Sequence, residues 1–234
     1  MIKLTKKPKN PIIIEGFPGF GFVGTIASEF LVEHLQTEQI GKMWFEELPS
    51  MVAIHREKLV EPIGIFYNKK YNILLVHAVS AAPGIEWKIA DEMISLAKDL
   101  KARELICLEG VGSQMPDDNP KTFCYSSDEK KKQALKKAGT QPLKEGIVMG
   151  VTSAIMVKAD FPVSAIFAEA HTDMPDSKAA AKILEVLNKY LDLKIDFKPL
   201  LESAEKFEEK LKGLMEKGQT AQTQKEKKMM SYVG

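Results

Sequence analysis

The chain has 234 residues, which suits one large domain or a domain with an appendage and excludes a mini-protein that depends on disulfides for stability. Hydrophobic residues make up 44% of it, enough for a sizeable core, and charged residues make up 28%. Because 33 basic residues are balanced by 32 acidic ones, the net charge of +1 argues against a nucleic-acid-binding domain.

Particular residue types narrow the class of protein further. Lysine and glutamate dominate the charged residues and only Arg56 and Arg103 are arginines, a composition that favours a heat-adapted source. Cys107 and Cys124 show no spacing typical of a zinc site or of a disulfide framework. No apolar segment follows the N-terminal lysines, and no apolar run approaches the ~20 residues of a membrane helix. We therefore expect a soluble cytoplasmic protein without a cofactor, a metal ion, or a nucleic-acid or membrane partner.

Apolar runs typical of buried strands alternate along the chain with stretches of helical periodicity. In chain order, the sequence predicts a strand at 11–15, a helix at 23–35, strands at 51–55, 62–67 and 72–78, a helix at 85–100, a strand at 104–108, a helix at 128–138, a strand at 163–168 and a helix at 177–190 that Asp176 caps. This alternation predicts an α/β domain with helices on both faces of a largely parallel sheet. A hairpin turn at 68–71 adds an antiparallel element, so we expect a mixed sheet.

The C-terminal part differs in character from the rest. A last helix is predicted at 199–217, and its apolar residues recur at spacings of three and four, as in a coiled-coil seam. Such a seam suits either packing on its own domain or contact with another subunit. Residues 218–228 are polar and are expected to be disordered. We therefore divide the chain into an α/β/α domain (1–197), a C-terminal amphipathic helix (198–217) and a flexible tail (218–234).

The loop after the first strand contains a GxGxxG motif at 19–24, the spacing of a dinucleotide-binding turn. Two phenylalanines, Phe20 and Phe22, make it bulky and apolar, extra residues separate it from the strand, and no ribose-binding acid is evident. We favour a structural loop that makes a tight strand-to-helix connection, with its special residues at Gly16, Pro18, Gly19, Gly21 and Gly24. Apolar side chains on a loop often mark an interface, so Phe20, Phe22 and Trp44 are predicted oligomer contacts.

No residue of the sequence stands out as a catalytic group. Ser80, Ser113 and Ser153 follow apolar runs, but none lies in the GxSxG turn of a nucleophile elbow. Three of the four histidines, His34, His55 and His77, suit structural roles. His171 follows a buried strand and could relay a proton to Asp173, although no nucleophile accompanies it. The acids at 117–118 are interpreted as a solvated turn. We predict no catalytic, cofactor-binding or metal-binding residue.

The whole-chain pattern resembles a known family. Residues 14–24, IEGFPGFGFVG, are similar to that family's G-[FW]-P-G-x-G-x-[VA]-G turn between a strand and a helix. Weaker likenesses follow in the expected order, at 40–41, 47–50, 105–112, 173–181 and 193–201. The family comprises the archaeal and bacterial relatives of the eukaryotic proteasome assembly chaperones, in particular of the second chaperone of that pair, and the likeness spans about residues 10–215.

The resemblance implies a three-layer α/β/α sandwich, related in shape to purine nucleoside phosphorylases, that acts through protein contacts and not as an enzyme. It also implies self-association and binding to proteasome α-subunits. Docking tails of such proteins typically end in a hydrophobic residue, a tyrosine and any last residue. Here the tip consists of Met229, Met230, Ser231, Tyr232, Val233 and Gly234, with the tyrosine third from the end. The tip is a predicted partner-binding segment, either for α-subunits or for a sister assembly chaperone. The alternative function is a nucleoside- or phosphate-handling enzyme that uses the loop at 16–24.

Overall fold

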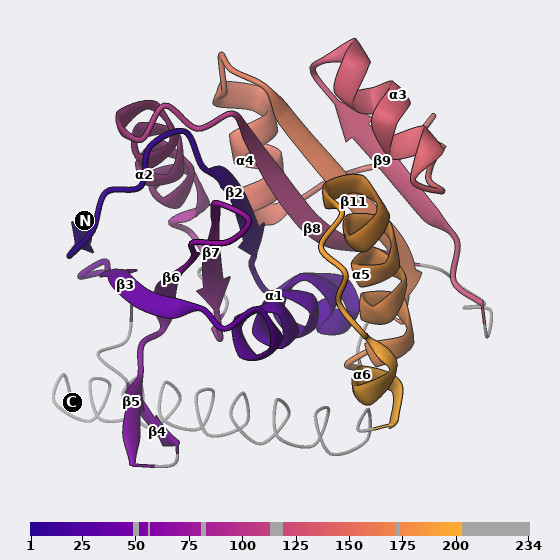
Figure 1. Ribbon diagram of the computed structural model, residues 1–234. Helices are drawn as coiled ribbons and strands as arrows, with labels where there is room; N and C mark the ends of the chain where they lie inside the picture. The colour runs from indigo at the N-terminus through magenta and orange to yellow at the C-terminus, as the bar shows by residue number, and fades with distance from the viewer. Residues whose placement is uncertain (49–51, 56, 81–82, 113–118, 172–173, 203–234) are drawn as a thin grey trace, which may run out of the picture.

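The computed structural model describes residues 1–234 apart from 49–51, 56, 81–82, 113–118, 172–173 and 203–234. A nine-stranded sheet runs through the molecule with helices on both of its faces, and a two-stranded hairpin projects from it (Figure 1). The elements are β1 (Ile2–Leu4), β2 (Ile12–Gly16), a 3-10 turn (Phe20–Phe22), α1 (Val23–His34), β3 (Glu38–Met43), β4 (Ala53–His55), β5 (Lys58–Val60), β6 (Ile63–Asn68), β7 (Ile73–Ala78), α2 (Glu86–Asp99), β8 (Glu104–Gly112), β9 (Thr122–Ser126), α3 (Glu129–Lys137), β10 (Gln141–Pro142), α4 (Gly150–Lys158), β11 (Val163–Ala170), α5 (Ser177–Leu191) and α6 (Lys198–Glu202).

The sheet is mixed and largely parallel, as the sequence predicts. Its strand order is β1-β3-β6-β7-β2-β8-β11-β9-β10, in which β7, β2, β8 and β11 run parallel in the centre. The turn between β6 and β7 makes the expected antiparallel hairpin, and β9 pairs antiparallel with β11. The α/β/α architecture is thereby confirmed.

Alternation along the central strands divides the interior into two apolar layers. Ile14 of β2 and Ile106 of β8 face a layer that α1 and α5 complete, whereas Ile13 and Leu105 face a layer that α2 and α4 complete. All four side chains are fully buried. Because side chains on a strand alternate between its two faces, a continuous apolar run such as residues 12–14 requires helices on both sides.

Most predicted elements are confirmed, with differences at their ends. The Asp176 Oδ1 accepts a hydrogen bond of 2.9 Å from the Ala179 amide, so this residue caps α5 as expected. β8 extends to Gly112, past the glycine at which the prediction ended it, because β11 pairs with it over its whole second half. Of the predicted helix at 199–217 only α6 is described, and the tail lies outside the described residues. The division into three parts therefore stays a prediction.

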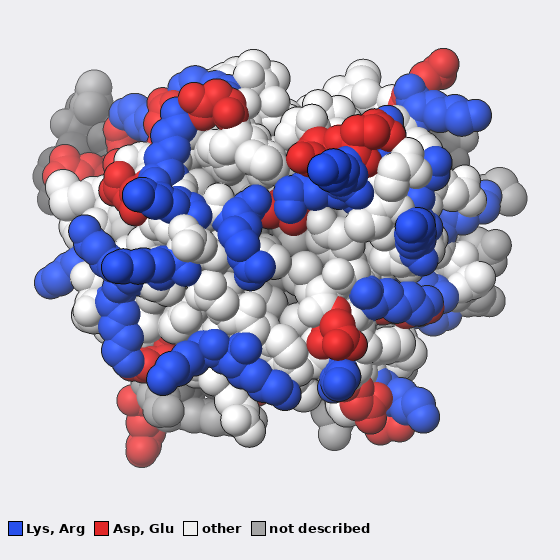
Figure 2. Space-filling view, turned by 45° about the horizontal axis from the view of Figure 1, so that its top comes forward, with Lys and Arg blue, Asp and Glu red and all other residues white. Residues whose placement is uncertain are grey.

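Basic side chains predominate on the face that Figure 2 turns forward. The loops that lead into the parallel strands β2, β7 and β8 carry seven exposed cations: Lys6, Lys7, Lys9, Lys69, Lys70, Lys101 and Arg103. These loops are hydrogen-bonded to one another, since the Asn72 side chain donates to the Lys9 carbonyl and the Arg103 Nε donates to the Asn10 carbonyl. A group of exposed cations thus lies at the amino ends of the central strands, whereas the glycine loop lies at their carboxyl ends.

Candidate functional site

The glycine loop connects the carboxyl end of β2 to α1 and packs closely against β8. A Cβ on Gly24, in the first turn of α1, would lie 2.3 Å from the Leu108 carbonyl oxygen, and a Cβ on Gly16 would lie 2.2 Å from the Gly24 carbonyl oxygen. Real side chains do not tolerate such distances. The motif therefore brings the start of α1 against the sheet, a role that accounts for glycine at both positions.

The three aromatic side chains predicted as oligomer contacts have different surroundings. Phe22 is half-buried and packs against the apolar layer of α1 and α5. Phe20 is half-buried and lines a cavity beside the loop. Trp44 is 37% exposed and lines a separate groove. Their role in self-association stays a prediction.

Two glutamates lie together beneath the loop, at the carboxyl ends of β2 and β8. Glu15 is fully buried, and Glu109 is half-buried. The hydroxyl of Thr152 on α4 lies 3.0 Å from Glu15 Oε1 and 3.2 Å from Glu109 Oε2, so one hydroxyl proton is placed between two carboxyl groups. The Phe17 amide donates to Glu15 and the Gly110 amide donates to Glu109.

Burial dominates the ionisation of this pair. It raises the pKa of Glu15 to about 7, although hydrogen bonds from Cys107, Thr152 and the Phe17 amide oppose the shift. Burial raises the pKa of Glu109 to about 8, and the neighbouring charge of Glu15 adds to it. Burial and the Glu15 charge likewise raise the pKa of the Cys107 thiol, which makes that thiol unreactive. At neutral pH the pair therefore retains protons that exposed glutamates would have lost.

Beside the pair lies a cavity of about 280 Å³, which we call the loop cavity. Its wall is mostly apolar and comes from the loop, the end of β8, Phe167 of β11 and the segment before α4. The lining residues are Phe17, Pro18, Gly19, Phe20, Pro83, Glu86, Glu109, Gly110, Val111, Ile147, Val148, Met149, Gly150, Val151 and Phe167. A Cβ on Gly19 would lie 1.7 Å from Glu109 Oε1, so the missing side chain at this position makes room for the carboxyl group.

This carboxyl pair was not predicted from the sequence, although the sequence holds a signal for it. In both Ile14-Glu15-Gly16 and Leu108-Glu109-Gly110, a glutamate stands between an apolar run and a glycine. A charged residue inside a run that otherwise predicts a fully buried strand indicates a buried ionisable group. Two such runs on neighbouring parallel strands place both groups at the same edge of the sheet.

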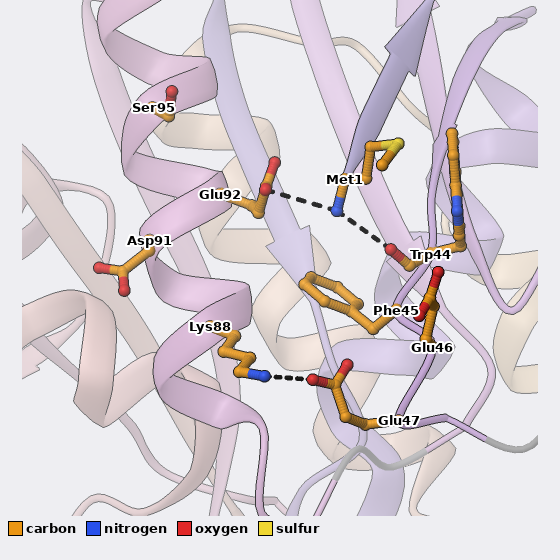
Figure 3. A pocket seen from close by; sticks show the side chains of 9 residues that line it. All are labelled: Met1, Trp44, Phe45, Glu46, Glu47, Lys88, Asp91, Glu92 and Ser95. Atoms are coloured by element: carbon orange, nitrogen blue, oxygen red, sulfur yellow. Dashed lines mark hydrogen bonds and ion pairs between the residues drawn. The ribbon is translucent and has the colours of Figure 1, made fainter.

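A wider groove of about 550 Å³ lies between α2 and the segment that follows β3 (Figure 3). In Figure 3 the N-terminal amine of Met1 is held between Glu92 and the Trp44 carbonyl, and Lys88 pairs with Glu47 across the groove. Two ion pairs, Met1–Glu92 and Lys88–Glu47, join groups of the groove to one another, and Asp91 pairs with Lys158 outside it. We assign no chemistry to it.

Two of the histidines, His77 and His171, make structural contacts. The Ser28 hydroxyl lies 2.8 Å from His77 Nδ1, and Glu29 Oε2 lies 2.8 Å from His77 Nε2. His171 Nδ1 lies 2.8 Å from Asp176 Oδ2, so this histidine contacts the residue that caps α5. Asp173, the relay partner considered from the sequence, lies outside the described residues, as do the acids at 117–118 and Ser113. Ser153 donates to the Gly150 carbonyl of its own helix.

Within the part of the chain that the structure describes, no three histidines, cysteines or acids gather in a way that could hold a metal ion. No helix in that part is long and apolar enough to span a membrane.

Comparison with known proteins identifies the family of the chain. The model of the PAC2 family matches residues 13–215. The chain belongs to the PAC2 family. This match covers the glycine loop, both buried glutamates and the α4 segment that bridges them.

Solved structures share the fold over nearly the whole of this PAC2-family chain. A crystal structure of Pyrococcus furiosus PbaA, an archaeal homolog of proteasome-assembly chaperone, is 30% identical, covers 95% of this chain and 100% of its own, and superposes with a TM-score of 0.84. P. furiosus PbaB, an archaeal proteasome activator, is 20% identical with a TM-score of 0.75, covering 92% of this chain and 98% of its own. An uncharacterised protein of Methanocaldococcus jannaschii is 26% identical over 99% of this chain and 98% of its own.

Proposed function

We propose that the chain is a non-enzymatic chaperone or scaffold of the proteasome-assembly type, acting through protein contacts and self-association. The observation that carries this proposal is the likeness to PbaA, which extends over 95% of the chain at 30% identity. The structural contacts of the glycines and histidines support it, since they leave these residues without an evident catalytic task.

An exposed apolar surface supports self-association. Four large apolar side chains stand out on α2, on α4 and just before α4: Trp87 (53% exposed), Ile147 (85%), Met149 (59%) and Val157 (73%). The ammonium group of Lys158 on α4 lies 5.6 Å from the centre of the Trp87 ring on α2, which joins the two helices at the surface. We call this the α2–α4 surface. Apolar side chains gathered in this way are typical of contacts between proteins, and we propose a second copy of the chain as the occupant.

The partner-binding segment of the proposal is the tip at 229–234, which lies outside the described residues. Its methionines and Tyr232 supply apolar contacts that adapt to grooves, and its free carboxylate could pair with a lysine of the partner. We propose proteasome α-subunits or a sister assembly chaperone as the partner.

Sedimentation of the chain at micromolar concentration, alone and with proteasome α-subunits, tests the proposal. We expect an oligomer alone and a larger complex with the subunits or with a sister chaperone. Deleting 229–234 should leave self-association intact and weaken partner binding. A chain that stays monomeric and binds neither partner would refute the proposal.

A thermal-shift screen with nucleosides, nucleotides and phosphate tests the enzymatic alternative. A reproducible stabilisation of the chain by one of these ligands would favour that alternative.

A further inference from the structure

The loop cavity combines an apolar wall with a charge of one sign. Its only charged lining residues among those described are Glu86 and Glu109, and no lysine or arginine reaches it. Three phenylalanines, Phe17, Phe20 and Phe167, contribute to the wall. A volume of about 280 Å³ accommodates a small organic molecule and sits at the carboxyl ends of the parallel strands, the edge at which α/β proteins bind ligands.

Glu109 is the group that can recognise a ligand there. Its Oε2 shares the Thr152 hydroxyl proton with Glu15, and its Oε1 receives only a long bond of 3.3 Å from the Gly110 amide. An ionised carboxylate can accept about four hydrogen bonds. The described residues donate two to Glu109, from the Thr152 hydroxyl and the Gly110 amide. A cation placed in the cavity would provide the missing donors and would favour the ionised form of Glu109, which burial and the neighbouring Glu15 disfavour.

We propose that the loop cavity binds a small molecule in which an ammonium group is attached to an apolar or aromatic body, with the ammonium on Glu109. The apolar body packs on the phenylalanines and valines of the wall, and the aromatic faces attract the cation. This inference does not rest on the proposed function, although Ile147 and Met149 belong both to the cavity wall and to the α2–α4 surface, because its test compares ligands on the same chain.

Binding has a defined pH dependence. Ionised Glu109 is the form that an ammonium group selects, so binding expels the proton that this side chain holds at neutral pH. The groups that face it are Glu15, the Cys107 thiol beyond it and Glu86 across the cavity, all of which are anionic or neutral. Affinity for an amine should therefore increase several-fold from pH 6.5 to 7.5, with release of a proton. A neutral ligand that accepts a hydrogen bond from protonated Glu109 would show the opposite trend.

Isothermal titration with benzylamine tests the proposal, and benzyl alcohol and benzoate serve as matched neutral and anionic probes of the same ring. We expect benzylamine to bind at least tenfold more tightly than either. Glu109→Gln should weaken benzylamine binding at least tenfold, whereas Glu145→Gln, the same change at an exposed residue outside the cavity, should leave it unaltered.

Phenylalanine amide distinguishes two sources of the ammonium group, because it carries the same ring and an ammonium on a backbone fragment. Tighter binding than that of benzylamine would assign the cavity to peptide amino termini, and weaker binding would assign it to free amines.

Three results would overturn the proposal. The first is binding of benzyl alcohol or benzoate as tight as that of benzylamine, and the second is unaltered benzylamine binding in Glu109→Gln. The third is no binding of benzylamine at about 10 mM, a concentration at which a ligand of eight non-hydrogen atoms and ordinary efficiency would be detected. The comparison of the three probes uses the wild-type chain alone, so it decides the matter even if the variant does not fold.

Discussion

Individual ionisable residues in this molecule have opposite effects on stability according to how they are partnered. Glu15 is fully buried, and burial raises its pKa from about 4.5 to about 7. The folded state therefore holds a proton that the unfolded chain releases above pH ~4.5. By proton linkage, the stabilising contribution is complete below that pH and is lost as the pH increases through 7.

The first prediction is that the free energy of unfolding falls between pH 5 and pH 9, by on the order of 3 kcal/mol for Glu15 alone. Glu109 adds to the decline, because its pKa is about 8. Glu15→Gln should match the wild type at pH 5 and exceed its stability at pH 9, since an amide cannot ionise. Urea unfolding at a series of pH values measures both. A wild-type profile that rises over this range would show that the carboxyl groups are ionised at little cost.

Glu104 at the start of β8 is the contrasting case. It is 1% exposed, but its carboxylate pairs with the Lys131 ammonium at 2.9 Å and accepts hydrogen bonds from Ser164 and from the Tyr190 hydroxyl at 3.0 Å. Burial, and after it the charge and hydrogen bond of this carboxylate, raises the pKa of Tyr190. This buried carboxylate is well partnered, so its loss leaves the Lys131 ammonium and the Tyr190 hydroxyl without their acceptor, whereas the Ser164 hydroxyl keeps Ser126 Oγ as one.

The second prediction is that Glu104→Gln destabilises the fold by about 2–4 kcal/mol at pH 7. The sign is the reverse of that for Glu15→Gln at high pH, although both replace a buried glutamate by its amide. Unfolding by urea at pH 7 measures the difference. Equal effects of the two substitutions would mean that burial alone, and not partnering, decides the outcome.

Among the helices, α2 ends in a turn whose conformation its sequence does not favour. The Ala102 amide donates to the Ala97 carbonyl and the Lys101 amide to the Lys98 carbonyl, the two bonds of a Schellman motif. Lys101 takes the left-handed position of this motif, with φ of 52°, where glycine is preferred. Its side chain is exposed.

The third prediction is that Lys101→Gly stabilises the chain by roughly 0.5–1 kcal/mol, because glycine adopts positive φ without a Cβ clash. The reference variant is Lys98→Gly, three residues earlier inside the helix. It should destabilise by about 1 kcal/mol, since glycine is a poor helix former, and it also removes the ion pair with Asp160. Thermal unfolding of the three chains checks the order. Destabilisation by both glycines would rule out relief of strain at 101.

Among the elements, strands are predicted best from the sequence where both of their faces are buried. Residues 12–14 and 105–108 form apolar runs that only a strand covered on both faces can bury, and both strands are found. β3 (Glu38–Met43) was not predicted, because it lies towards the edge of the sheet and its sequence EQIGKM shows little alternation. Its place depends on pairing with β6 and β1, which local sequence does not reveal.

The candidate site is less predictable than the fold, because it depends on contacts between distant segments. Glu15 and Thr152 are separated by 137 positions along the chain, and their hydrogen bond exists only once α4 lies on the sheet. The glycine motif was recognised as structural, yet the space that Gly19 leaves for Glu109 could not be inferred without knowing that β8 is the neighbour of β2. Periodicity identifies elements, whereas a site requires their arrangement.

For the whole molecule, the α2–α4 surface gives a prediction that links stability to association. Val157 is 73% exposed on α4, so a glutamate at this position should alter the stability of an isolated chain by no more than about 0.5 kcal/mol. In an oligomer, the same change would bury a charge against an apolar neighbour. When two folded copies form a dimer, each tenfold rise in protein concentration stabilises the dimer by about 1.4 kcal/mol, which is about 0.7 kcal/mol per chain.

The fourth prediction is therefore that the unfolding temperature of the wild type rises by about 1.5–3 °C for each tenfold increase in protein concentration, the shift expected for about 0.7 kcal/mol per chain of this size. In Val157→Glu the midpoint should be independent of concentration and equal to that of the dilute wild type. Ala134→Glu, the same kind of change on the exposed side of α3, should retain the wild-type dependence. Differential scanning calorimetry over two decades of concentration measures all three. If Val157→Glu kept the wild-type slope, the contact between copies would lie on another face of the molecule, and Trp44 or Phe20 would be the next residue to substitute.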